Sequence, residues 1–343
     1  MDFPRIGRLP AGPRDLVSDV AGVTVGHATL AEGALQTGVT VLRPHAGDPF
    51  RDRVPAAAMV LNGFGKSTGL VQVEELGVLE TPIALTNTFA VGAIAQAQIR
   101  LCVADNPQSG RAQPTVNPLV FECTDGFLND IQALALGDAH YRQALAAAAA
   151  DFALGSVGAG RGMSSFGLKG GIGSASRRAG AHTVGAVVLS NYGRPEQLVW
   201  GGQPLGAALA AWLAQEPAPE KGSIIMLLAT DAPLDARQLR RLALRAGAGL
   251  ARTGSVFGHG SGDLALAFST AYTLPQDPQR PMPAVALLHD ALLDPLFQAA
   301  ADATEQAIVK ALWQAEPVTG RDGHARTALR ALLPELLTSN PSA

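Results

Sequence analysis

The chain has 343 residues, of which 47% are hydrophobic and 16% are charged, and its formal net charge is −3. This length and composition predict one large domain, or two ordinary ones, with a sizeable buried core. The slightly acidic balance excludes the strongly basic surface that is typical of nucleic-acid binding proteins.

The composition also gives no sign of a membrane, metal or disulfide protein. The longest apolar runs are alanine-rich or strand-length, so we expect no transmembrane helix. The first 14 residues contain Pro4, Pro10 and Pro13 and no apolar core, unlike a secretory signal. Two cysteines, Cys102 and Cys123, are too few for a metal cluster or a disulfide framework. We therefore expect a cytoplasmic protein that needs no metal and no cofactor.

The first two thirds of the chain predict strands interspersed with helices. Alternating apolar and small residues, or short apolar runs, predict strands. They occur twice within 16–42 and once each at 56–61, 82–88 and 183–189. Helical spacing or alanine content predicts helices at 92–102, 141–154 and 203–215.

Two stretches in this region are rich in glycine. Residues 62–69 look like a phosphate loop, but Val60 stands where the Walker pattern requires a glycine, so we interpret the stretch as a tight turn. Residues 155–173 contain eight glycines around Arg161 and Lys169. Such density permits either close backbone approach to another group or a long loop.

The strand predicted at 224–229 is apolar throughout, as expected for a strand buried on both faces. It follows a polar tract at 215–220, so Ser223 would begin a core strand and Gly222 would end a loop. A serine there can attack the preceding carbonyl, and an N→O acyl shift with hydrolysis would free its α-amino group. Ser223 would then carry nucleophile and base together. The alternative is that Gly-Ser only opens a strand, which is common in a chain with 38 glycines.

The last third predicts a helix capped by Asp235, strands at 261–269 and 283–288, and helices at 295–313 and 325–337. If Ser261 and Asp263 both lie in a strand, their side chains share one face. Otherwise they belong to the glycine-rich turn at 255–262. Glu122, at the end of an apolar run, and Asn191, at a strand end, are each typical of ordinary turn chemistry when taken alone.

Taken together and in order, several motifs resemble the DmpA family, which comprises L-aminopeptidase/D-Ala-esterase/amidases and β-aminopeptidases. The motifs are SDVAGVTVGHAT at 18–29, ECTDGFLND at 122–130, FGLKGGIG at 166–173, SNYG at 190–193, GS at 222–223 with ATDAPL at 229–234, and SGD at 261–263. The resemblance covers nearly the whole chain. It implies a single α/β domain over 1–343, a four-layer αββα sandwich similar in architecture to the N-terminal nucleophile hydrolases.

The resemblance also implies that the precursor cuts itself between Gly222 and Ser223. Fragments 1–222 and 223–343 would stay in one folded unit, and Ser223 would be the catalytic nucleophile. Asn191 matches the asparagine whose side chain helps to form the oxyanion hole.

Four further positions acquire roles from the same resemblance. Glu122 matches the acid that binds the free amino group of the substrate. Thr124 stands on the substrate-binding side, where the L-aminopeptidase has a tyrosine. Ser261 and Asp263 match a Ser-Gly-acid motif that could orient the new amine and relay its proton, with Asp263 where the β-aminopeptidases carry glutamate.

The implied activity is hydrolysis of amides or short peptides with a free amino terminus, through an acyl-enzyme. The implied assembly is a homo-oligomer of cleaved units, a tetramer or larger. Two alternatives stay open. Ornithine acetyltransferases share the fold but use threonine followed by methionine, where this chain has Ser223 and Ile224. A non-catalytic binding or oligomeric protein would migrate as one intact band on a denaturing gel.

Overall fold

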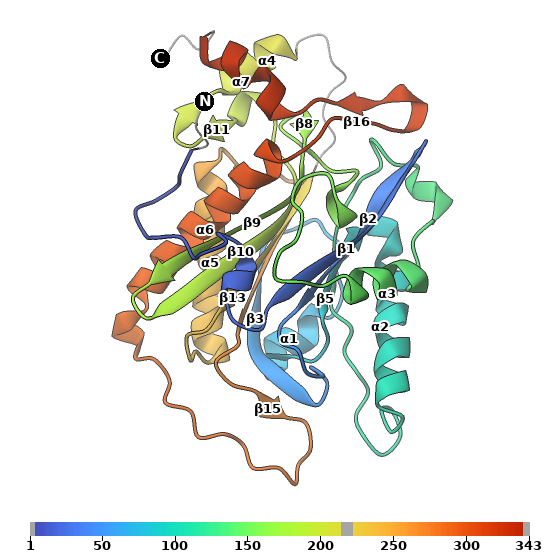
Figure 1. Ribbon diagram of the computed structural model, residues 1–343, viewed down its shortest axis with the longest axis vertical. Coiled ribbons are helices and arrows are strands. Elements are labelled where there is room, and N and C mark those ends of the chain that lie inside the picture. Colours follow the sequence, from blue (N-terminus) through green and yellow to red (C-terminus); the bar gives the residue numbers. More distant parts are fainter. Residues whose placement is uncertain (1–3, 214–221, 339–343) are drawn as a thin grey trace.

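The computed structural model describes residues 4–213 and 222–338. Two β-sheets pack face to face in the middle of the molecule, and helices cover both outer faces (Figure 1). Helices α5 (Ala236–Arg252) and α6 (Asp294–Trp313) cover the larger sheet, and α2 (Val91–Asp105) and α3 (Asp138–Ala146) cover the smaller one. The fold is the predicted αββα sandwich.

The larger sheet has the strand order β15-β3-β14-β13-β10-β9, and β4 also pairs with β3. Its strands are β3 (Asp52–Gly63), β4 (Val78–Leu79), β9 (Gly171–Ala179), β10 (His182–Asn191), β13 (Ser223–Thr230), β14 (Gly262–Ser269) and β15 (Leu274–Pro275). Strands β13 and β14 are parallel and lie between β3 and β10, which run antiparallel to them. Strands β13 and β14, which follow residue 222, therefore lie between two strands that precede it.

The smaller sheet has the order β1-β2-β5-β6, formed by β1 (Thr24–Glu32), β2 (Leu35–Arg43), β5 (Ile83–Asn87) and β6 (Val120–Cys123). Three short helices complete the periphery: α1 (Leu70–Leu76), α4 (Gly206–Trp212) and α7 (Leu329–Thr338). Three two-residue hairpins are β7 (Ser164–Ser165) with β8 (Leu168–Lys169), β11 (Val199–Trp200) with β12 (Gln203–Pro204), and β16 (Val318–Thr319) with β17 (Ala325–Arg326).

Every residue of β13 is buried, which confirms the prediction for 224–229. Because side chains alternate along a strand, Ile225 and Leu227 point to the core between the sheets. Ile224 and Met226 point to the core under α5 and α6. The strand is apolar throughout because neither face meets water.

Some predicted elements are wrong in extent. The alanine-rich helix ends at Ala146, since Ala149 exchanges two backbone hydrogen bonds with Val25 at the edge of β1. Helix propensity is a weak preference that such pairing overrides. The helices expected at 203–215 and 325–337 begin later, at Gly206 and Leu329. The tract at 215–220 lies outside the described residues.

Other predictions fail in kind. Residues 283–288 form no strand but belong to an exposed loop, and Pro283 has no N–H to offer a neighbouring strand. Val17–Asp19 is a short 3₁₀ helix rather than part of the first strand. Strand β9 begins at Gly171, within the last three residues of the glycine-rich stretch, and is a mostly buried strand rich in glycine, serine and arginine that no apolar pattern indicated. Among the described residues, no helix is both long enough and apolar enough to cross a membrane.

Candidate active site

Ser223 begins β13 in the middle of the larger sheet. On one side it pairs with Asn191, the last residue of β10, and on the other the next residue, Ile224, pairs with Asp263 of β14. The side chain is only 6% exposed. Its Oγ accepts a hydrogen bond of 3.1 Å from the N–H of Gly262. The hydroxyl is therefore held beside two of the residues that the sequence singled out.

Gly222 is buried directly before the strand, against the backbone of Asn191 and Tyr192. A Cβ atom at Gly222 would overlap the carbonyl oxygen of Asn191, so a larger residue would have to move the chain. Glycine is thus required by close approach rather than by a left-handed backbone angle. The Gly222 carbonyl carbon has no neighbouring Cβ that could hinder attack by the Ser223 hydroxyl.

Ser261 and Asp263 meet beside the nucleophile. Ser261 precedes β14 rather than lying in it, and its Oγ donates to Asp263 Oδ1 at 2.6 Å. The other carboxylate oxygen, Oδ2, is buried and has no hydrogen-bond partner among the described residues. Burial raises the pKa of Asp263 to about 6, and the hydrogen bond from Ser261 opposes part of that shift. An unpaired, buried carboxylate oxygen is well suited to receive an ammonium group.

Asn191 is 1% exposed, and its carboxamide is held at both ends. Its Oδ1 accepts from the N–H of Ser164 at 2.8 Å, and its Nδ2 donates to the carbonyl of Thr124 at 2.9 Å. These two contacts fix which end of the amide is the donor. One hydrogen of Nδ2 is left over, as a donor to a developing oxyanion requires. Thr124 thus enters the site through its backbone.

The loop that supplies the Ser164 N–H is closed by Lys169, which is completely buried. Its Nζ donates to the carbonyls of Gly160, Met163 and Gly170 at 2.8, 2.8 and 2.9 Å. Burial lowers the pKa of Lys169 well below its usual value, with a smaller contribution from Arg161. The backbone carbonyls of the glycine-rich stretch therefore bind the Lys169 amine, and the N–H of Ser164 in the same stretch holds the Asn191 side chain.

Glu122 lies one residue before the end of β6, the edge strand of the smaller sheet, and is 3% exposed. Its Oε1 accepts from the N–H of Lys66 at 2.7 Å, and its Oε2 accepts from the hydroxyl of Thr88. Gly65 lies between Glu122 of the smaller sheet and Gly262 of the larger sheet. A Cβ atom at Gly65 would contact both Glu122 Oε1 and the Cα of Gly262. Gly262 in turn binds Ser223. The carboxylate and the nucleophile are therefore separated by a single layer of backbone.

The structure brings together all seven residues selected from the sequence: Glu122, Thr124, Asn191, Gly222, Ser223, Ser261 and Asp263. Sequence reasoning missed the backbone donors of Lys66, Ser164 and Gly262, since every residue but proline has an N–H and no residue type marks its use. A lone lysine among eight glycines was the available signal for Lys169.

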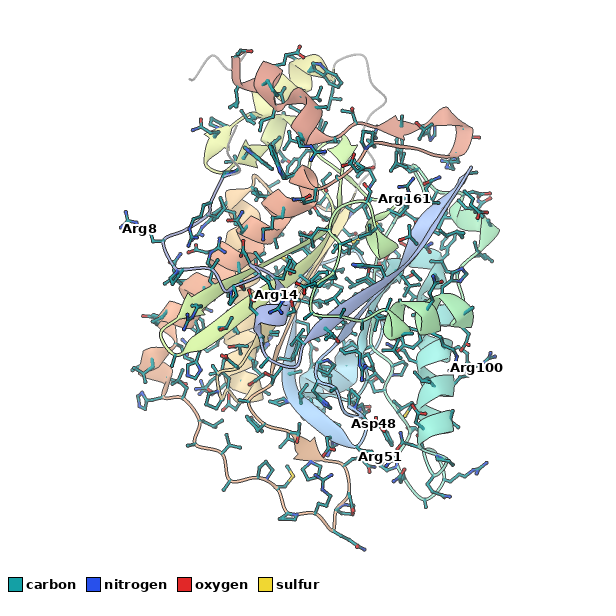
Figure 2. All side chains as sticks on the ribbon, viewed as in Figure 1. Arg8, Arg14, Asp48, Arg51, Arg100 and Arg161 are labelled. Carbon is teal, nitrogen blue, oxygen red and sulfur yellow. The ribbon has the colours of Figure 1, made fainter. Side chains whose placement is uncertain are left out.

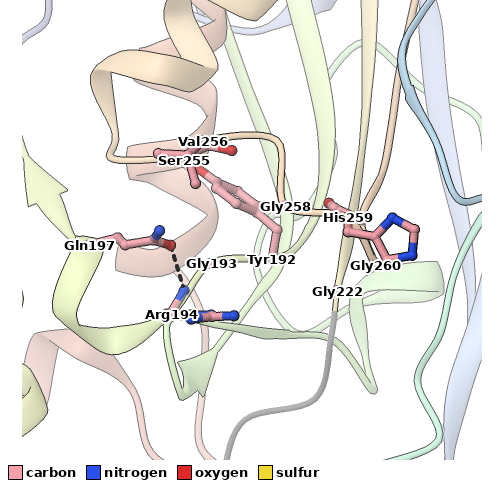
Figure 3. Close-up of a pocket in the computed structure, with 11 residues that line it drawn as sticks. Tyr192, Gly193, Arg194, Gln197, Gly222, Ser255, Val256, Gly258, His259 and Gly260 are labelled. Carbon is pink, nitrogen blue, oxygen red and sulfur yellow. Dashed lines mark hydrogen bonds between the residues drawn. The ribbon is translucent and has the colours of Figure 1, made fainter.

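A cavity of about 310 Å³ opens next to this group (Figure 3). Gly222 and Ser261 lie on its wall, together with residues that follow β10 and residues of the loop before β14. The complete lining is Tyr192, Gly193, Arg194, Gln197, Gly222, Ser255, Val256, Gly258, His259, Gly260 and Ser261. The site is thus open on the side of the large sheet.

Comparisons with known proteins agree on one group. A family model described as peptidase family S58 matches residues 15–326. The chain is 37% identical to the β-peptidyl aminopeptidase BapA of Sphingosinicella microcystinivorans, covering 94% of this chain and 88% of that one. The structure of the PH0078 protein of Pyrococcus horikoshii OT3 has a TM-score of 0.91 at 44% identity, covering 98% and 97% of the two chains. The L-aminopeptidase D-Ala-esterase/amidase of Ochrobactrum anthropi, described as a prototype for the serine aminopeptidases, has a TM-score of 0.89 at 34% identity, covering 97% of each.

Proposed function

This chain belongs to peptidase family S58, the DmpA family, and we propose that the site around Ser223 is its self-generated active site. The family, the relatives and the fold make the chain a serine aminopeptidase of the N-terminal nucleophile type. The acetyltransferase and non-catalytic alternatives are therefore set aside. What remains to propose is the cut between Gly222 and Ser223 and the role of each residue.

The observation that carries the proposal is the arrangement at the start of β13. A buried serine hydroxyl, held by the Gly262 N–H, lies one strand away from a buried carboxylate with an unpaired oxygen. Cutting the bond before Ser223 would create an α-ammonium group on the residue directly before Ile224, the strand neighbour of Asp263. The unpaired Oδ2 supports that outcome, because the uncut chain offers this oxygen no donor within the described residues.

In the proposed maturation, the Ser223 hydroxyl attacks the carbonyl carbon of Gly222. The oxyanion takes the remaining hydrogen bond of Asn191 Nδ2, the C–N bond breaks, and the Ser223 nitrogen takes up the hydroxyl proton. Water then hydrolyses the ester and leaves a carboxylate on Gly222. The products are fragments 1–222 and 223–343.

In each later turnover, the free α-amine of Ser223 accepts the proton of its own hydroxyl as Oγ attacks the substrate carbonyl. Ser261 and Asp263 hold that amine, and Asn191 again stabilises the oxyanion. The amine returns the proton to the leaving nitrogen. Water hydrolyses the acyl-enzyme and releases the amino-terminal residue.

Glu122 is proposed to bind the ammonium group of the substrate, with Thr124 beside it. The Lys66 N–H and the Thr88 hydroxyl orient the carboxylate, and its remaining lone pairs can accept from an ammonium. A free amino terminus would then be required. Because the chain is similar to β-peptidyl aminopeptidases, we propose that residues with a β-amino group are accepted at this position.

We further propose a cytoplasmic homo-oligomer of cleaved units, a tetramer or larger, as the family resemblance implies. Free thiols at Cys102 and Cys123 are compatible with a reducing compartment. Sedimentation of the purified protein would measure the assembly, and a monomer would refute this part.

The central test is amino-terminal sequencing of the purified protein. We expect two fragments, the smaller beginning at Ser223, and hydrolysis of β-alanyl and L-alanyl p-nitroanilides. Ser223→Ala should give one uncut, inactive chain. Cleavage elsewhere, or an uncut parent that hydrolyses both anilides, would refute the proposed nucleophile.

The role of Glu122 needs a separate measurement. Glu122→Gln should still mature, since no substrate amine takes part in the cut, but should show a raised KM for free-amino anilides. The ratio of activity on free and N-acetylated substrates should fall. An unchanged ratio would mean that Glu122 only braces the surrounding loops.

A further inference from the structure

The cavity beside Gly222 has an unusual charge composition for a site that already uses carboxylates. Of its lining residues in the described part of the chain, the basic ones are Arg194 and His259, and none is an aspartate or glutamate. Both side chains are exposed at the cavity. Positive charge without an acidic partner favours an anionic ligand.

Arg194 follows the end of β10, three residues after Asn191. Its guanidinium makes no ion pair and no side-chain hydrogen bond within residues 4–213 and 222–338. Its backbone N–H donates to Gln197 Oε1 at 3.2 Å, which leaves the two hydrogens of Gln197 Nε2 free to donate. Figure 3 shows the Arg194 side chain pointing from the Gln197 side of the cavity toward Gly222. The cavity therefore offers a planar cation and a neighbouring amide donor, a combination suited to a carboxylate.

The cavity lies beside Gly222 and Ser261, on the side of the reacting bond that faces away from Glu122. Gly222 and Ser261 line it, whereas Glu122 does not. A substrate with its ammonium group at Glu122 and its scissile carbonyl at Ser223 would therefore send its other end, the leaving group, into the cavity. A volume of about 310 Å³ is small for a ligand pocket, so it suits a single residue better than a long peptide.

We propose that this cavity is the leaving-group pocket and that Arg194, assisted by Gln197, binds the terminal carboxylate of a one-residue leaving group. The inference rests on the proposed function and narrows it: the preferred substrates are dipeptides with a free carboxyl terminus. Hydrolysis releases two amino acids, the second of which carries both the new amine and the carboxylate that Arg194 holds.

The test compares β-alanyl-L-alanine with β-alanyl-L-alaninamide, and the two matching L-alanyl compounds, on the matured protein. We expect the free acid to have the lower KM in each pair that is cleaved. Arg194→Gln should raise KM for the acid by about 10-fold, the effect of losing a charge-assisted hydrogen bond, and leave KM for the amide nearly unchanged. Arg194→Lys should recover part of the preference.

Arg100→Gln is the matched control, because Arg100 projects to solvent from α2, away from the cavity (Figure 2). It should behave as the parent. If the parent cleaves acid and amide with equal KM, or cleaves anilides but no dipeptide, the leaving-group assignment fails while the aminopeptidase site stands. If neither anilides nor dipeptides are cleaved by a correctly matured protein, the proposed function itself fails.

Discussion

At the scale of single residues, Asp263 is a buried carboxylate that lowers the stability of the uncut chain and is proposed to hold the catalytic amine after the cut. Its pKa of about 6 in the folded chain lies above the ordinary aspartate value of 3.8, because the buried carboxylate is desolvated. The stability that the protonated group contributes is therefore complete below pH 4 and is lost as the pH rises through 6. At neutral pH, the uncut chain keeps a charged carboxylate that destabilises it until an ammonium group arrives.

We expect Asp263→Asn, in the uncut Ser223→Ala background, to raise the free energy of unfolding at pH 8 by up to about 3 kcal/mol, and to change it little at pH 4. Urea denaturation at the two pH values measures this. The same substitution in the active chain should abolish most peptidase activity. Equal changes in stability at both pH values would show that Asp263 is not the titrating group.

Gly222 provides a second prediction at this scale. Gly222→Ala places a methyl group on the carbonyl oxygen of Asn191, so the backbone at the scissile bond has to shift and its alignment with Ser223 Oγ changes. Self-cleavage should slow by an order of magnitude or more, as expected when reacting groups lose alignment. A time course on denaturing gels measures the rate.

The control for Gly222→Ala is Gly258→Ala, since a Cβ at Gly258 meets nothing within 4 Å. This variant alters the same cavity wall and should mature like the parent. Equal self-cleavage rates for the two variants would show that the close approach of Gly222 to Asn191 does not control the cut.

At the scale of elements, the glycine-rich stretch 155–173 supports Asn191, the residue proposed to form the oxyanion hole, through the N–H of Ser164. Lys169→Met should remove the lysine donor from three carbonyls, of which those of Gly160 and Met163 keep a backbone N–H donor. The cost should be about 1–3 kcal/mol for a buried carbonyl that is left with no other partner. Because Ser164 is next to Met163 and holds Asn191, kcat should also fall, while KM changes less.

Lys310→Met separates loss of stability from loss of catalysis. Lys310 is a half-buried lysine on α6 that forms an ion pair with Asp15, and neither residue belongs to the proposed active site. It should lower the free energy of unfolding and leave kcat unchanged. If both variants reduce kcat in proportion to stability, Lys169 has no specific positioning role.

The elements also show what the sequence could and could not predict. The apolar patterns predict the strand at 224–229 and the helix capped by Asp235, because in both elements the apolar positions match the buried ones. Strand β9 was missed because its buried faces carry serine, glycine and a paired arginine, Arg177, in place of apolar residues. The apolar run at 283–288 predicts a strand where the structure has a loop, because an apolar run does not reveal whether a neighbouring strand exists.

The same limit applies to the site. Glu122, Asn191, Ser223 and Asp263 were selected by resemblance, since each one alone is ordinary turn chemistry. Their partners are largely backbone groups brought from other segments by the fold, and no residue type marks those. Arg194 carried no signal at all, since its relevance depends on a cavity that only the folded chain defines.

At the scale of the whole molecule, the larger sheet joins the two proposed fragments. Strands β13 and β14 of 223–343 pair with β10 and β3 of 1–222. Helices α5 and α6 add a large apolar contact with that sheet. We expect the cut protein to elute from gel filtration as one species containing both fragments, and to separate only in denaturant. Separation in plain buffer would contradict a shared core.

Because strands of both proposed fragments alternate in this sheet, folding would involve one chain before the cut and two chains after it. Before the cut, the linking peptide keeps the two halves at a high effective concentration, so strand pairing is intramolecular. Ser223→Ala should therefore refold from urea at a rate that does not depend on protein concentration. The matured protein has lost its tether, so its refolding yield should rise with concentration, and an equal yield at all dilutions would contradict this. The proposed cut would thus make stability depend on the rate of unfolding, and that rate would set the working life of each enzyme molecule.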